Sequence, residues 1–153
     1  MKAPLALPAG LFCVRALGVL PDATFDIMML LFSACGIYNL LFAVFHVAFW
    51  RLFGWKAELA KLHPVNRGIM QALNLRLIHV LLLFGALYLM FPEALQTTAL
   101  GHFLLGGIAL CWLGRLVEQV FFLRLRGWLV HFMTLVFLLG VVLHGLAFWL
   151  GRQ

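Results

Sequence analysis

Residues 27–50 read IMMLLFSACGIYNLLFAVFHVAFW, a stretch without a single Asp, Glu, Lys or Arg. A helix needs about 20 apolar residues to cross the hydrocarbon core of a bilayer, so this stretch predicts a membrane-spanning helix. The whole chain has the same character: of 153 residues, 65% are hydrophobic and 10% are charged. Soluble domains contain roughly half apolar and a quarter charged residues, and a small soluble fold cannot hide so much apolar surface. We therefore predict an integral membrane protein.

Three further apolar stretches predict three more spans. The second ends at Phe91 and Pro92, a pair that terminates a helix. Its uninterrupted apolar run from Leu77 is too short for a bilayer, so we place its start near Ala72 and let the Arg76 side chain extend to the interface. The predicted fold is all-α, a membrane protein with four transmembrane helices in an up-down-up-down bundle. The spans cover about 27–50, 72–91, 97–116 and 127–149.

Little of the chain remains outside these spans, so we treat residues 1–153 as a single membrane domain. Prolines, glycines and Arg15 interrupt residues 1–23, and we expect an irregular or interfacial segment there rather than a cleaved signal peptide. Residues 51–71 form the longest connection. Within it, residues 53–62 place apolar side chains at helical spacing against charged ones, which predicts a short amphipathic helix lying on the membrane interface.

Basic residues gather in two of the three connections between spans. These residues are Arg51, Lys56, Lys61, Arg67 and Arg76 after the first span, and Arg115, Arg124 and Arg126 after the third. Because Lys and Arg are enriched on the cytoplasmic side, we predict that both connections face the cytoplasm of a cell (inner) membrane. Both termini would then lie on the opposite side. The net charge of +6 does not predict a nucleic-acid partner, because the cations are spread singly among apolar runs; the predicted partner is the lipid bilayer.

Histidines inside the predicted spans are the first candidates for chemistry, because ionisable groups are costly in a membrane. His46, His79 and His131 lie on three different spans, roughly 7–10 Å inside the cytoplasmic boundary at 1.5 Å per residue. Glu118 lies near the same level. Helices that each offer one ligand at one depth are how bundles build metal sites, and imidazole with carboxylate suits zinc or iron. One interpretation is therefore a divalent metal site.

A second interpretation is haem b held by histidine pairs. His102 and His144 would bind one haem near the outer face, and His131 with His46 or His79 would bind another near the inner face. Helical phase argues against two stacked haems, because His131 and His144 lie roughly 140° away from a shared helix face. It does not argue against a single haem.

The third interpretation gives these polar groups a structural role. Residues 32–50 carry a stripe of small and polar side chains, among them Gly36, Asn39 and His46, and such stripes mark helix–helix contacts in lipid. A comparable stripe on the third span consists of Gly107, Cys111, Gly114 and Glu118. Both stripes are also compatible with a homo-oligomer or a larger membrane complex. The leading prediction is a non-catalytic binding, transport or accessory subunit within the bilayer. The alternative is a haem- or metal-bearing redox protein or enzyme, and the sequence does not decide whether the chain is an enzyme.

Overall fold

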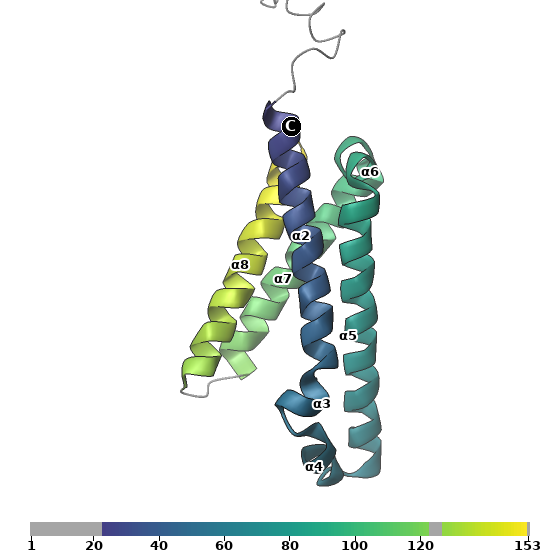
Figure 1. Cartoon of the computed structure of the whole chain (residues 1–153), viewed down its shortest axis with the longest axis vertical. Coiled ribbons are helices and arrows are strands. Elements are labelled where there is room, and N and C mark those ends of the chain that lie inside the picture. Colours follow the sequence, from purple (N-terminus) through teal and green to yellow (C-terminus); the bar gives the residue numbers. More distant parts are fainter. Residues whose placement is uncertain (1–22, 123–126, 153) are drawn as a thin grey trace, which may run out of the picture.

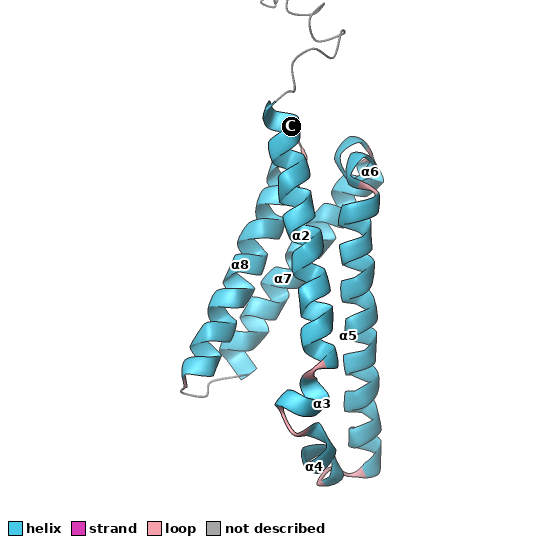
Figure 2. Ribbon diagram, viewed as in Figure 1, coloured by secondary structure: helices cyan, strands magenta, loops and turns pink. Residues whose placement is uncertain are grey.

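The structure is a computed structural model that describes residues 23–122 and 127–152. In these two segments every regular element is an α-helix (Figure 2). Four helices are long and apolar enough to cross a membrane: Asp26–Val47, Pro64–Met90, Ala99–Phe122 and Trp128–Leu150. These findings confirm an all-helical chain with four candidate membrane spans. Residues 1–22 of the predicted irregular segment, together with Arg124 and Arg126, lie outside the described residues.

The four long helices are α2 (Ala23–Val47), α5 (Pro64–Met90), α7 (Ala99–Phe122) and α8 (Trp128–Leu150). Helix α5 starts eight residues before the predicted span at Ala72, because Pro64 occupies its first turn and has no backbone N–H to leave unpaired there. Residues 64–70, which this added stretch contains, are all exposed. Helix α7 extends to Phe122, beyond the predicted end of the third span at 116.

Three short helices complete the described chain: α3 (Phe49–Leu52), α4 (Trp55–Ala60) and α6 (Pro92–Thr97). The first span was predicted to run to Trp50, whereas α2 ends at Val47 and α3 continues after a turn at Ala48. Gly54 then adopts φ +56°, a left-handed conformation that favours glycine, and this turn leads into α4. Helix α4 lies within the predicted amphipathic segment 53–62 and buries one side chain, Leu59.

Helix α2 pairs with α5, and its contact with α8 joins this pair to the pair of α7 and α8. It packs along α5 on one side and against α8 on the other, while α7 packs mainly on α8 (Figure 1). Gly36 of α2 and Gly85 of α5 face each other at the first contact: a Cβ added at Gly36 would lie 3.3 Å from the Gly85 carbonyl oxygen, and one added at Gly85 would lie 3.2 Å from that of Gly36. Small residues allow such close backbone approach in lipid. Helices α5 and α7 are linked through α6 at one end and separate toward the other (Figure 1).

Candidate functional site

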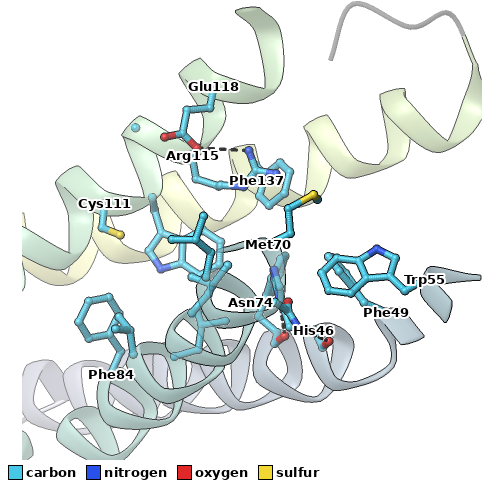
Figure 3. Close-up of a pocket in the computed structure, with 17 residues that line it drawn as sticks. His46, Phe49, Trp55, Met70, Asn74, Phe84, Cys111, Arg115, Glu118 and Phe137 are labelled. Carbon is cyan, nitrogen blue, oxygen red and sulfur yellow. Dashed lines mark hydrogen bonds and ion pairs between the residues drawn. The ribbon is translucent and has the colours of Figure 1, made fainter. Parts of the chain in front are cut away.

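A groove with a volume of about 690 Å³ lies between α5 and α7. This volume is within the range of small-molecule sites, roughly 300–1,000 Å³. Figure 3 shows labelled side chains of α7 on one side of the groove and those of α2 and α5 on the other. The side chains that line it are mostly apolar, and the polar ones are His46, Asn74, Cys111, Arg115 and Glu118.

Helix α5 supplies one continuous apolar wall. Leu73, Leu77, Leu81 and Phe84 line the groove at intervals of three or four residues, the spacing that places side chains on one helical face. From Leu73 to Phe84 this face extends roughly 17 Å along the helix. The hydrocarbon core of a bilayer is about 30 Å thick, so the wall is about as long as one leaflet is thick.

Helix α7 supplies the two charged groups of the groove. Nη1 of Arg115 lies 3.5 Å from Oε2 of Glu118, and both side chains are partly exposed. The Arg115 guanidinium also lies over the Phe137 ring, 4.6 Å from its centroid, in a cation–π contact. Exposed ion pairs of this kind are weak, on the order of 0–1 kcal/mol. A guanidinium has five N–H donors, so the Arg115 side chain retains donors for a further acceptor.

Two more polar side chains lie at the same end of the groove. The His46 ring is buried, and its Nδ1 lies 2.8 Å from the Phe42 carbonyl oxygen, to which it must donate. In the neutral ring, Nε2 is then a hydrogen-bond acceptor. The Asn74 amide donates to the His46 carbonyl at 3.2 Å. That carbonyl belongs to the last turn of α2, where the helix no longer supplies every donor, so Asn74 fixes the end of α2 against α5.

A second buried polar cluster lies between α2 and α8, away from the groove charges. The amide nitrogen of Asn39 donates to the Cys35 carbonyl at 2.8 Å and lies 2.9 Å from Nε2 of His144. Nδ1 of His144 lies 2.8 Å from the Gly140 carbonyl oxygen. Both contacts fit a neutral imidazole with its proton on Nδ1, and the ring is fully buried and stacked on Trp112. Both nitrogens of His144 are therefore already engaged within the protein.

These contacts bear on the predicted haem pair. The structure pairs His144 with Asn39, and His102 instead donates from Nε2 to the Gln96 carbonyl at 2.7 Å. A histidine that ligates haem iron needs a ring nitrogen free for the metal. The haem assignment to His102 and His144 stays a prediction, and this geometry does not support it.

The predicted metal ligands are also dispersed. His46 is buried, whereas the side chains of His79 and His131 are exposed on the outer surfaces of α5 and α8. Within the part of the chain that the structure describes, no three His, Cys, Asp or Glu side chains gather as ligands would. Of the predicted set, only His46 and Glu118 line the groove together.

Two polar side chains were not among the predicted residues, Asn74 in the groove and Tyr38 outside it. Asn74 is an isolated amide inside the predicted second span, a signal of the same kind as Asn39, and its role depends on the end of α2 reaching it. Tyr38 donates to the Val136 carbonyl at 2.6 Å, and no spacing pattern in the sequence indicated this contact. The sequence matches no known protein family, no curated protein and no solved structure.

Proposed function

We propose that this chain is a non-catalytic binding protein of the membrane, and that its groove between α5 and α7 holds one amphiphilic molecule drawn from the bilayer. One observation carries the proposal: the groove combines an apolar wall about as long as one leaflet is thick with two charged side chains, Arg115 and Glu118, which lie together at one end. An amphiphile has the same division, because its hydrocarbon part avoids polar contacts and its head requires them.

The position of the polar end follows from the helix order. Glu118 and Arg115 lie near the C-terminal end of α7, and His46 lies near the C-terminal end of α2. Phe84 lies farther from the start of α5 at Pro64 than any other lining residue of that helix. If the four helices cross in alternating directions, with the connections after α2 and α7 in the cytoplasm, this end lies at the inner interface. The amphiphile would then sit in the inner leaflet with its head near the cytoplasm. This orientation is part of the proposal and is supported by the basic residues of the first connection.

Two glycines of α7 provide a matched test. A Cβ added at Gly114, which lines the groove, or at Gly107, which does not, would meet no atom within 4 Å. The first carbon of a side chain therefore meets no obstacle at either position, and both substitutions replace glycine within the same helix. Gly114→Leu puts its new side chain into the groove, whereas Gly107→Leu adds the same side chain outside it.

The test is native mass spectrometry of the full chain released from detergent micelles after extraction from membranes. We expect the wild type and Gly107→Leu to retain a lipid-mass adduct of one molecule per chain, and Gly114→Leu to lose most of it. Circular dichroism of each variant verifies that helix content is unchanged. Equal retention by Gly114→Leu, or the absence of any adduct on the wild type, would overturn the proposal.

A further inference from the structure

The charged end of the groove has a particular pattern. Of the side chains that line it, two carry a full charge, and these charges are opposite. Arg115 and Glu118 are three residues apart on α7, a spacing at which Cβ atoms on one helical face are roughly 5–6 Å apart. Their closest charged atoms are 3.5 Å apart, at the long end for a hydrogen bond. The two charged groups are therefore close enough to contact the same headgroup. Their interaction is weak enough for each to separate from the other and bind that headgroup instead.

We infer that the groove selects a phospholipid with a zwitterionic head, in which a phosphate and an ammonium group are neighbours. Arg115 would bind the phosphate, because a guanidinium presents paired donors that match phosphate oxygens. Glu118 would bind the ammonium group. Nε2 of His46, an acceptor at the same end of the groove, is available to any N–H that the head presents. This inference rests on the proposed function and adds the chemical class of the occupant.

Other headgroups fit the same charges less well. An anionic head with no ammonium would place its charge beside Glu118 as well as Arg115, and a cationic amphiphile would meet Arg115 in the same way. Like charges at such separations repel, most of all in a site partly removed from water. An uncharged lipid would leave both groups without a ligand partner. A zwitterion satisfies both charges while keeping the site neutral.

The apolar part of the groove supports a lipid over a small water-soluble zwitterion. Leu77, Leu81 and Phe84 continue the groove from the charged end for roughly 10 Å along α5. An amino acid would fill the charged end and leave this wall without a partner. A phospholipid fills both parts at once, with its acyl chains along α5.

The experiment is a competition among lipids that differ only in their heads. The full chain is reconstituted with equal amounts of phosphatidylethanolamine, phosphatidylcholine and phosphatidylglycerol of identical acyl composition, and the retained lipid is counted by native mass spectrometry. We expect the wild type to retain the two zwitterionic lipids over the anionic one by roughly fivefold, the size of a weak ion-pair effect. Glu118→Gln leaves one positive charge and should reverse the preference toward phosphatidylglycerol. Arg115→Gln should weaken retention of all three.

The outcomes separate this inference from the function on which it rests. Retention of one lipid without headgroup preference, or a preference for phosphatidylglycerol in the wild type, would overturn the inference and leave the binding groove intact. If no lipid is retained, both fail. A dimer that Gly114→Leu dissociates would show that a second copy fills the groove, and this too would overturn the inference. If Arg115→Gln does not fold, as judged by circular dichroism, the reversal in Glu118→Gln alone decides the outcome.

Discussion

The crossing of α2 and α5 gives a quantitative test of the packing. A Cβ added to Gly36 would lie 2.6 Å from Cγ and 2.8 Å from Cδ2 of Leu89, and 3.3 Å from the Gly85 carbonyl oxygen. The first two distances are shorter than carbon atoms tolerate, so Gly36→Ala must displace the Leu89 side chain or separate the helices. We expect this single methyl group to destabilise the protein.

The magnitude follows from two opposing effects. Overpacking of a close contact costs typically about 1–3 kcal/mol, while replacing glycine by alanine in a helix gains up to about 1 kcal/mol. Because the gain offsets part of the cost, Gly36→Ala should lower the free energy of unfolding by up to about 2 kcal/mol. Gly107→Ala makes the same exchange at a site where the new Cβ meets nothing within 4 Å. It should be neutral or stabilising by up to about 1 kcal/mol.

A second substitution identifies the cause of the loss. Because two of the close contacts of the new methyl group involve Leu89, trimming that side chain should relieve them. Leu89 is 42% exposed, so Leu89→Ala alone should cost little. The double variant Gly36→Ala, Leu89→Ala should then recover most of the loss, with a coupling energy of roughly 0.5–3 kcal/mol as found for residues in contact.

The assay is equilibrium unfolding in mixed micelles with increasing sodium dodecyl sulfate, followed by far-ultraviolet circular dichroism. A stability for Gly36→Ala equal to that of Gly107→Ala would refute the close crossing. So would a double variant whose loss equals the sum of its single losses, because that result leaves no contact between residues 36 and 89.

The same unfolding assay checks three further predictions. Tyr38→Phe removes a hydrogen bond to the α8 backbone and should cost about 0.6 kcal/mol, and at most about 1.7, as measured for hydrogen bonds between membrane helices; a loss above 3 kcal/mol would contradict this role. Asn74→Leu takes the donor from a carbonyl at the end of α2 and should cost about 1–3 kcal/mol, whereas Asn66→Leu, at an exposed position of the same helix, should stay within about 0.5 kcal/mol. His144→Leu leaves buried polar partners unpaired and should lower the free energy of unfolding by about 1–3 kcal/mol. His79→Leu replaces a side chain on an exposed surface and should change the free energy of unfolding little. Equal losses of stability in the two variants would contradict this prediction and indicate a shared role.

The positions of the spans could be predicted from the sequence because each depends on local composition. A run of about 20 apolar residues predicts a helix in lipid whichever helix it packs against, and all four runs became helices. The ends were less predictable. Helix α2 stops three residues before Trp50, since the turn at Ala48 redirects the chain into α3 and Asn74 of another helix stabilises that end.

The contacts between polar side chains could not be predicted. The depth of a residue in the membrane can be estimated from its own helix, whereas a contact depends on how two helices pack against each other. His46 and His79 were placed at one depth, yet one side chain is buried and the other is exposed, because α5 turns the His79 side chain outward. The pairing of His144 with His102 stays a prediction, and the contact that the structure shows for His144 is a hydrogen bond with Asn39 of α2. Depth was estimated from flanking charges, whereas these contacts depend on α2 packing against α8.

The groove itself follows from where small and large side chains fall along the helices. Gly36 and Gly85 bring α2 against α5, and Gly101 fits against Leu95 of α6, where a Cβ would lie 2.6 Å from the Leu95 Cα. Farther along toward the charged end, the rings of Phe42 and Trp112 meet with centroids 4.9 Å apart.

These two rings fill the space between α2 and α7. Glycines at the same positions would have allowed the two helix backbones to approach each other closely. The large rings therefore keep α7 and α8 at a distance from α5. This packing leaves the groove in which we propose that an amphiphile binds, and Arg115 and Glu118 lie at the end that we assign to its head.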